Sequence, residues 1–235
     1  MSLRDTVRFP LLQGRRMYPK GVIGEFAAMV RKPKHLRDFE KFGCNYWKQW
    51  ANEDGSINID YGNAWFEGDQ IEHLKDCLAN NPNDRRMIIN AWRPERLAEL
   101  NLPCCHYSYQ FYVSDGYLSM VWIQRSVDTM IGLPSDIILA AVWLITLANE
   151  FNYKTGDITM QLGDCHLYEE HIESGAVDEY LENVRKFNNT IFLKTALPYY
   201  ALTSEPGADF TIFEPQNLAI TEYATCDNIQ LELKS

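Results

Sequence analysis

Residues 107–123 read YSYQFYVS-DG-YLSMVWI, and residues 136–149 read DIILAAVWLITLAN. The first stretch holds two runs of aromatic and β-branched residues, and the Asp115-Gly116 step between them is the strongest short-range signal for a β-hairpin. The second stretch follows Pro134 and is apolar around its whole circumference, which is typical of a helix enclosed on all sides. We therefore predict a sheet packed against a buried central helix.

Further elements are predicted on both sides of this unit. The spacing of apolar residues predicts helices over residues 21–30, 36–50 and 70–78. Runs of β-forming residues predict strands over 87–89, 107–114, 117–123, 158–162, 190–193, 210–213 and 229–233. Because strands and helices do not alternate strictly, the pattern favours an α+β fold.

Composition narrows the class of partner. The formal net charge is −10, which repels nucleic acid unless basic residues cluster, so no nucleic acid is expected to be required. The longest uncharged apolar run, residues 137–148, is shorter than the ~20 residues that cross a bilayer, and residues 1–7 lack a secretory pattern. The six cysteines have no zinc-site spacing, so we expect reduced thiols in the cytoplasm and no metal.

Several polar motifs stand where plain structural elements do not need them. They are Pro103-Cys104-Cys105-His106 before a strand, Gln124-Arg125-Ser126-Val127-Asp128 at a strand end, Asn83-Asp84-Arg85-Arg86, and Gly163-Asp164-Cys165-His166-Leu167-Tyr168. Taken singly, each has a plain structural interpretation: a buried thiol, solvated charges, or a loop with a capping Asp. Glu25 falls on the buried face of the helix at 21–30, where a carboxylate is either paired or functional.

Together these motifs resemble the thymidylate synthase family. The segments that match, in order from about residue 9 to residue 171, are Phe9-Pro10-Leu11, Trp47-Lys48-Gln49-Trp50-Ala51-Asn52-Glu53-Asp54-Gly55, Tyr61-Gly62, Asp84-Arg85-Arg86, Ala91-Trp92, Leu102-Pro103-Cys104-Cys105-His106, Gln110-Phe111-Tyr112-Val113, Gln124-Arg125-Ser126-Val127-Asp128, Gly132-Leu133-Pro134 and Gly163-Asp164-Cys165-His166-Leu167-Tyr168. The resemblance implies a single catalytic domain over residues 1–235, with a large mixed sheet and a sheet-mediated homodimer.

The resemblance also implies roles for catalytic residues. Cys105, directly before His106, looks like the nucleophile that adds to C6 of a pyrimidine nucleotide, and the Arg125 guanidinium would favour its thiolate. Glu25 matches the carboxylate that organises proton transfer at the base through ordered water. Tyr61 matches the phenol that helps remove the C5 proton.

Binding roles follow from the same resemblance. Arg125 and Ser126 would hold the substrate phosphate, to which Arg85 and Arg86 would reach from the partner subunit. His166 and Tyr168 would bind the sugar 3′-hydroxyl. Asp128 would serve both ligands, and the folate co-substrate, 5,10-methylenetetrahydrofolate, would be lined by Trp47, Trp50, Asp128 and Gly132.

Asp136 departs from the family pattern. After Gly-Leu-Pro the family has Phe-Asn, and this chain has Ser135-Asp136. The Asn reads uracil, whereas a carboxylate can accept from the cytosine amino group and from a protonated N3. Asp at this position resembles the phage deoxycytidylate hydroxymethylases. The alternative is that Asp136 caps the N-terminus of the apolar helix.

Two further departures favour hydration of the transferred carbon. Residues 229–235 lack the family's short apolar closing tail, and Ser135 replaces a Phe that packs on folate, so water would be excluded less completely. The mobile phosphate-binding Arg near the family's N-terminus also has no clear counterpart. Either Arg4 replaces it, or Arg85, Arg86 and Arg125 suffice.

The sequence therefore predicts a folate-dependent dCMP 5-hydroxymethylase, phage-encoded and acting in the host cytoplasm. The small hydroxyl of Ser126 favours dCMP over CMP. Methylation of dUMP or dCMP is the alternative within the class. The alternative from another class is a regulator that binds nucleotide or RNA without catalysis.

Overall fold

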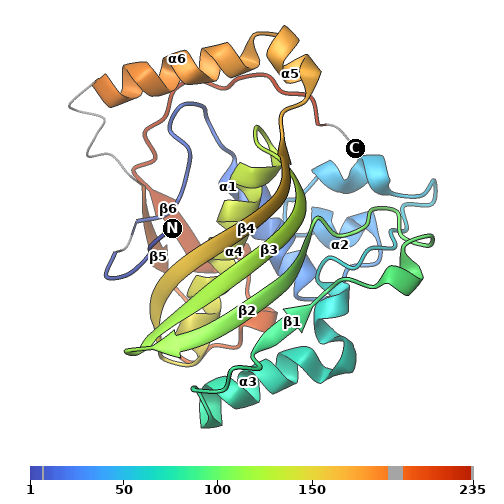
Figure 1. The fold of residues 1–235 in the computed structure, drawn as a ribbon, viewed down its shortest axis with the longest axis vertical. Helices are drawn as coiled ribbons and strands as arrows, with labels where there is room; N and C mark the ends of the chain where they lie inside the picture. Colours follow the sequence, from blue (N-terminus) through green and yellow to red (C-terminus); the bar gives the residue numbers. More distant parts are fainter. Residues whose placement is uncertain (7, 190–197, 234–235) are drawn as a thin grey trace.

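A four-stranded sheet forms the front layer of the molecule (Figure 1). The computed structural model describes residues 1–6, 8–189 and 198–233. The strands lie in the order β1-β2-β3-β4, with β1 (Ile88–Asn90) and β2 (His106–Ser114) antiparallel and β2 antiparallel to β3 (Tyr117–Asp128). β4 (Lys154–His166) runs parallel to β3. The predicted hairpin is confirmed, with Asp115 and Gly116 both at positive φ in its turn.

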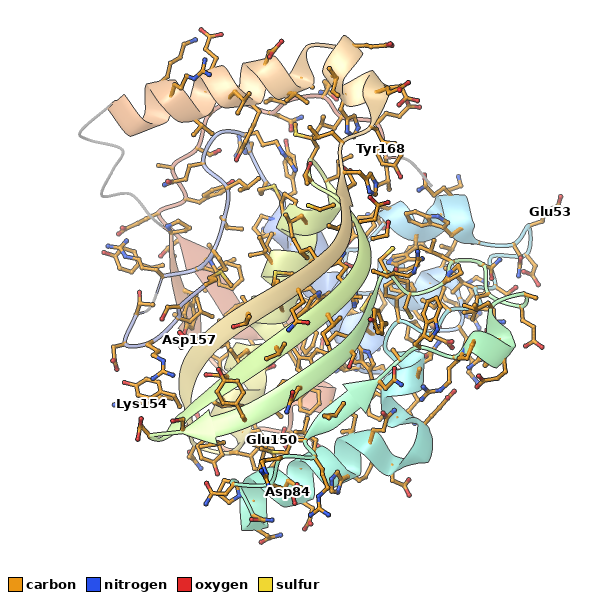
Figure 2. The ribbon with its side chains drawn as sticks, in the orientation of Figure 1. Glu53, Asp84, Glu150, Lys154, Asp157 and Tyr168 are labelled. Carbon is orange, nitrogen blue, oxygen red and sulfur yellow. The ribbon has the colours of Figure 1, made fainter. Side chains whose placement is uncertain are left out.

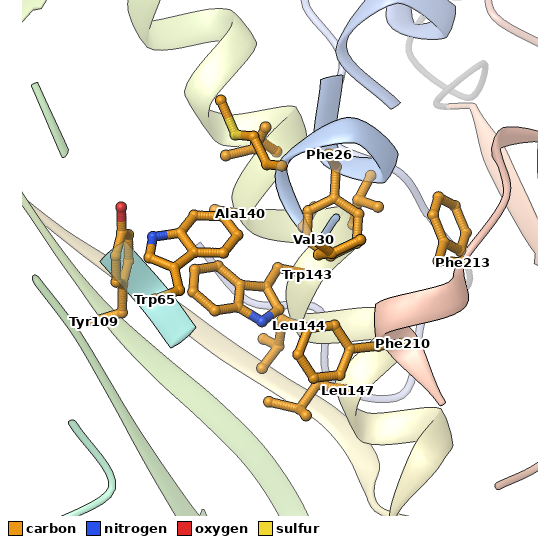
Figure 3. Close-up of a cluster of buried hydrophobic side chains, with 14 of the residues drawn as sticks. Phe26, Val30, Trp65, Tyr109, Ala140, Trp143, Leu144, Leu147, Phe210 and Phe213 are labelled. Atoms are coloured by element: carbon orange, nitrogen blue, oxygen red, sulfur yellow. The ribbon is translucent and has the colours of Figure 1, made fainter. Parts of the chain in front are cut away.

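Helix α4 (Gly132–Glu150) is the centre of the core. Residues 138–148 are all buried, which confirms the predicted central helix, although it begins four residues earlier than residue 136. Trp143 of α4 stacks on Trp65 with ring centroids 4.1 Å apart and packs against Tyr109 and Phe111 of β2 (Figure 3). α4 is long and apolar enough to cross a membrane, but 67% of its apolar 18-residue window is buried in the fold, as expected of a core helix.

Helix α1 (Pro19–Met29) packs on α4 behind the sheet, so that Glu25 is carried into the interior. The predicted single helix over residues 36–50 is wrong: α2 (Leu36–Glu40) ends early, and a separate 3₁₀ helix, η1 (Tyr46–Trp50), follows. Gly43 separates them at φ +80°, a left-handed conformation that ends a helix. Because η1 starts separately from α2, its Tyr46 and Trp47 side chains lie against Glu25.

The remaining elements surround this core. α3 (Gln70–Asn80) confirms the predicted helix and leads to β1. The other elements are 3₁₀ helices η2 (Asn63–Asp69), η3 (Pro94–Arg96), η5 (Phe210–Ile212) and η6 (Pro215–Asn217), helices α5 (Glu169–Glu173) and α6 (Ala176–Asn189), and strands β5 (Tyr199–Leu202) and β6 (Leu218–Thr221), which pair antiparallel.

Three strand predictions in the C-terminal third fare differently. The strand over 210–213 is wrong, because η5 occupies those residues with Asp209 capping it. The strand over 229–233 is also wrong, since those residues have no regular structure. The strand over 190–193 lies outside the described residues. In contrast, the strands predicted over 87–89, 117–123 and 158–162 are present, and the last two extend to Asp128 and His166.

The two ends of the β3–β4 pair lie at opposite ends of the sheet. Asp128 pairs with His166 at the end of β3 and β4 nearest Tyr168, whereas Tyr117 and Lys154 pair at the other end. Figure 2 shows Tyr168 far from Lys154, Asp157 and Asp84. The polar motifs around residues 105, 125 and 166 therefore gather at one end of the sheet.

Candidate active site

Cys105 precedes β2 and sits between a phenol and a guanidinium. Its backbone N–H donates to the Tyr61 hydroxyl at 2.6 Å, and the Arg125 Nη2 lies 4.0 Å from its Sγ. Burial raises the pKa of the Cys105 thiol, while Tyr61 and Arg125 act in the opposite direction. Burial therefore favours the protonated thiol, whereas Tyr61 and Arg125 favour the thiolate that acts as a nucleophile.

Arg125 is anchored at the end of β3 by the loop that carries the cysteines. Its Nε donates to the Cys104 carbonyl at 2.9 Å and its Nη2 to the Pro103 carbonyl at 3.2 Å. The guanidinium also lies over the Trp92 ring, 5.6 Å from its centroid. The side chain is exposed, so its position is fixed while its charge still faces solvent. Such a cation is suited to bind an anion beside Cys105.

Asp136 is partly buried beside His106 and does not cap α4. The helix begins at Gly132 with Ile131 as its N-cap, so the capping alternative is wrong. The Gln124 amide donates to Asp136 Oδ2 at 2.6 Å, and the Asp136 side chain is 18% exposed. Burial raises the pKa of Asp136 to about 8, with the hydrogen bond from Gln124 acting against it and Glu25 adding to it. The carboxyl group is therefore mostly protonated at neutral pH.

His106 lies beneath Asp136 as a neutral ring. Its Nε2 is 3.9 Å from Asp136 Oδ1, and its Nδ1 is 2.5 Å from the Tyr109 hydroxyl. Burial lowers the pKa of His106 to about 3. Because the imidazole is uncharged, it offers no cation to ionise the neighbouring carboxyl group.

Glu25 is the second buried carboxyl group of the site. Its Oε2 accepts from the Tyr46 hydroxyl at 2.6 Å and its Oε1 from the Trp47 indole N–H at 2.7 Å. Burial raises the pKa of Glu25 to about 7, and both hydrogen bonds act in the opposite direction. Of the two alternatives for a carboxylate on this helix face, paired or functional, the structure shows that Glu25 is paired.

Aromatic rings join these groups into one wall. The Tyr61 ring packs edge-on against Trp47 at 5.5 Å and against His106 at 4.8 Å, between centroids. Trp50 packs against Trp47 at 5.3 Å and is only partly buried. Its indole nitrogen is buried without a hydrogen-bond partner among the described residues. The structure thus brings together six predicted site residues: Glu25, Trp47, Trp50, Tyr61, Cys105 and Asp136.

A second group of predicted residues lies where β3 and β4 end. The His166 and Tyr168 rings pack edge-on at 5.1 Å. Asp128 accepts from the backbone N–H groups of Met130 and Ile131, and so fixes the turn into α4. Ser126, half-buried, pairs with Asp164 in the β3–β4 ladder. These residues share the end of the sheet that holds Arg125.

Gly132 opens α4 with space beside it. A Cβ built there would meet only the Asp128 Cβ and the Val127 Cγ2, both at 3.8 Å. The packing of the chain itself therefore does not require glycine at this position.

Arg85, Arg86 and Arg4 are not brought to Cys105 within one chain. Arg86 pairs with Asp84 at 2.6 Å in the turn after α3, and that pair lowers the pKa of Asp84. Arg4 pairs with Asp157 at 2.7 Å. Asp84 and Asp157 both lie far from Tyr168 in Figure 2. Within its own chain Arg4 is therefore paired away from Cys105.

Sequence reasoning missed three side chains that shape the site. Gln124 and His106 belong to the quoted motifs but were assigned no role, although both lie next to Asp136. Tyr46 was likewise assigned no role, although its hydroxyl donates to Glu25. Gln124 could have been found, because it is a polar residue at a core-facing position of β3. Among the described residues, no group of three or more His, Cys, Asp or Glu side chains could hold a metal ion.

Comparison with known proteins identifies the family of the chain. The family model described as thymidylate synthase matches residues 1–235. The solved structure of thermostable thymidylate synthase A from Bacillus subtilis superposes with a TM-score of 0.83 at 26% identity, over 99% of this chain and 83% of that one. A match of this extent defines a one-carbon transferase that acts on pyrimidine nucleotides. The chain belongs to the thymidylate synthase family, and the predicted α+β fold is confirmed.

Proposed function

We propose that the protein is a folate-dependent dCMP 5-hydroxymethylase. The observation that carries this proposal is the carboxyl group of Asp136, which replaces the amide that reads uracil in the family. It is buried beside Cys105 and held by Gln124, and burial raises its pKa to about 8. A buried acid at this position is chemically matched to a base that carries a basic nitrogen.

Cytosine has that nitrogen. Gln124 donates to Asp136 Oδ2, so the carboxyl proton belongs on Oδ1, from which it can be given to cytosine N3. The carboxylate then accepts from the protonated N3 and from the 4-amino group. Uracil presents N3–H and O4 instead and has no basic nitrogen to take the proton. A site built for one pattern rejects the other by ~10⁴-fold where buried polar groups are left unpaired.

Protonation at N3 also assists the nucleophile. It draws electron density from C6, to which the Cys105 thiolate adds, with Arg125 and Tyr61 favouring the thiolate. The methylene carbon of the co-substrate methylenetetrahydrofolate bonds to C5. The C5 proton is then lost and tetrahydrofolate leaves with the C–N bonding pair, so that an exocyclic methylene group remains on C5. In this proposal Tyr61 helps to remove the C5 proton, and Glu25 organises its transfer through ordered water.

Hydration completes the reaction. The oxygen of water bonds to the methylene carbon on C5, and the water proton passes to the Glu25 carboxylate. The π pair moves into the C5–C6 bond, and the Cys105 sulfur leaves C6 with the bonding pair. Ser135 supports water access: its hydroxyl turns back to the Ile131 carbonyl, where the family has a Phe packed on folate.

We assign the remaining site residues to binding of the nucleotide and the folate. Arg125 and Ser126 bind the phosphate, His166 and Tyr168 the 3′-hydroxyl, and Trp47, Trp50, Asp128 and Gly132 the folate. A homodimer forms through the face of the sheet that no helix covers in Figure 1, and brings Arg85 and Arg86 to the partner's phosphate. The enzyme would act in the cytoplasm, supplying a modified base for phage DNA.

The experiment that tests the substrate combines tritium release with product mass. Protein is incubated with methylenetetrahydrofolate and with dCMP, CMP or dUMP tritiated at C5. We expect release from dCMP, a product heavier by a hydroxymethyl group, and no dihydrofolate absorbance. Preferred turnover of dUMP would refute the role of Asp136, and a methylated product with dihydrofolate would refute hydration.

Asp136→Asn tests the specificity directly. We expect the kcat/KM ratio of dCMP to dUMP to fall by at least ~10³-fold, because the amide restores the pattern that reads uracil. Cys105→Ser should abolish tritium release from any nucleotide, and Cys104→Ser is the matched control that should retain it. A wild-type protein that binds dCMP but releases no tritium would support the non-catalytic regulator instead.

A further inference from the structure

Tyr46 links the solvent-facing surface to the buried Glu25 carboxylate. The residue is 37% exposed, yet its hydroxyl reaches Glu25 Oε2 at 2.6 Å. Tyr46 stands directly before Trp47, whose indole holds the other carboxylate oxygen at 2.7 Å. Two consecutive residues of η1 therefore donate hydrogen bonds to the two oxygens of the Glu25 carboxylate. These bonds fix the rotation of the carboxylate about the Cγ–Cδ bond.

We infer that Tyr46 is a positioning residue for Glu25, which it holds in the orientation and ionised form that proton transfer at the base requires. The inference rests on the proposed function, because that function assigns the proton transfer to Glu25. A hydrogen bond from a neutral donor to a buried carboxylate stabilises the ionised form over the protonated one. Tyr46 thus offsets part of the burial that otherwise keeps the proton on Glu25.

The other groups around Glu25 cannot take over this task. Cys44, which precedes η1, is a buried thiol whose pKa is raised by burial and by Glu25. Asp136 on α4 is a second acid, and its own pKa is raised by burial and by Glu25. Trp47 donates to the other oxygen and has no second N–H. Removing the Tyr46 hydroxyl therefore leaves Oε2 without its donor.

The test is the pH profile of C5 tritium release from dCMP in wild type and Tyr46→Phe. We expect the acid limb of kcat in Tyr46→Phe to lie about one pH unit higher, because Glu25 loses one of two donors and must be ionised to act. Well above that limb the two rates should converge, and the KM for dCMP should stay within about twofold. A purely structural role would lower the rate at every pH.

The matched control is Tyr117→Phe. Tyr117 also donates its phenol to a carboxylate, Asp5, but at the end of β3 remote from Asp128. Its pH profile should overlay the wild type. Coincident acid limbs for Tyr46→Phe and wild type would overturn the inference, as would a uniform loss of rate.

A second measurement keeps the inference testable where Tyr46→Phe is inactive. The titration of Glu25 is followed by ¹³C NMR of labelled carboxyl groups, with Glu25→Gln identifying its signal. We expect the Glu25 midpoint to move up by about one unit in Tyr46→Phe, and an unmoved midpoint would overturn the inference. Failure of the proposed function is recognised separately, since wild type would then release no tritium from dCMP.

Discussion

At the scale of single residues, the carboxyl groups of Glu25 and Asp136 differ in how readily they ionise, which suits them to different roles. Burial raises the pKa of both, to about 7 for Glu25 and about 8 for Asp136. Glu25 has two hydrogen-bond donors and Asp136 has one, so Glu25 ionises first. Ionised Glu25 then disfavours ionisation of Asp136. Near neutral pH the pair thus offers one base and one acid, which is how acid and base roles are separated in a common environment.

Asp136 should lower the stability of the fold as pH rises. Its pKa is about 8 in the folded chain and ~3.9 in an unfolded one, so between these values only the unfolded chain releases the proton. The penalty is absent below about pH 4 and complete above about pH 8. Asp136→Asn removes it while keeping an acceptor for Gln124. We expect Tm to rise by ~2–8 °C at pH 8 and by less at pH 5.5, measured by calorimetry.

The control for this prediction is Asp157→Asn, which has the opposite sign. Hydrogen bonds from Ser2 and Arg4 lower the pKa of Asp157, and stability gained from such a group is present above the unfolded pKa and lost as pH falls through the folded pKa. Asp157→Asn should therefore lower Tm at neutral pH. A Tm difference for Asp136→Asn that does not change between pH 5.5 and 8 would contradict the prediction.

At the scale of elements, long-range contacts explain where sequence patterns fail. The apolar spacing over 36–50 predicted one helix, but the Phe42 carbonyl packs so closely on Gly24 of α1 that a Cβ there would lie 2.1 Å away. Gly43 then turns the chain at positive φ, and η1 starts afresh. Periodicity within the segment carries no information about that approach. The hairpin and α4 were predictable because local turn chemistry and apolarity alone decide them.

The C-terminal third shows the same limit. Phe210 and Phe213 were assigned to a strand, yet both are buried against Phe26 from a 3₁₀ turn. Residues three apart share a face in a 3₁₀ turn and not in a strand, and two aromatic residues are too few to tell the periods apart. The site residues were predictable from motifs, but the contacts of Gln124, His106 and Tyr46 depend on how elements pack.

The N-terminus of α4 gives a prediction at this scale. Gly132→Ala places a methyl group where the nearest atoms are 3.8 Å away, at a helix position that alanine favours. We expect Tm to stay within about 1 °C, while the KM for methylenetetrahydrofolate rises by at least ~10-fold because the proposed folate site places the ring against Gly132. The KM for dCMP should not change. An unchanged folate KM would remove Gly132 from the folate site.

Gly24→Ala is the contrasting variant. The added Cβ would lie 2.1 Å from the Phe42 backbone carbonyl, so α1 must move relative to the segment before η1. Overpacking of this kind costs ~1–3 kcal/mol, which corresponds to a Tm lower by several degrees. The pair separates a glycine kept for packing from one kept for a ligand.

At the scale of the whole molecule, charge limits what one chain can do. The net charge is −10, and a nucleotide phosphate is an anion. Within one chain Arg125 is the predicted phosphate ligand beside Cys105, whereas Arg4 and Arg86 pair with acids remote from Tyr168. Arg85 and Arg86 are exposed, in a turn that a second protomer could face. A complete phosphate site is therefore expected only where two chains meet.

Subunit mixing tests this expectation. In the proposed homodimer, Cys105→Ser removes the proposed nucleophile and Arg85→Ala/Arg86→Ala removes the proposed phosphate ligands, so each variant alone should be inactive or nearly so. In the mixed dimer, one site combines an intact Cys105 with intact arginines from the other chain. Random pairing makes half of the dimers mixed with one good site each, so we expect about one quarter of wild-type tritium release.

The mixing experiment has a control built on the same residues. If Arg85 and Arg86 acted within their own chain, no site in the mixed dimer would hold both an intact cysteine and intact arginines, and mixing would restore nothing. Pairing Cys105→Ser with Tyr61→Phe, whose two residues contact each other within one chain, should restore no more activity than the Tyr61→Phe homodimer contributes. If activity recovers when Cys105→Ser is mixed with the arginine variant but not with Tyr61→Phe, Arg85 and Arg86 act across the interface. If activity does not recover in either mixture, these arginines do not contribute to the partner's site.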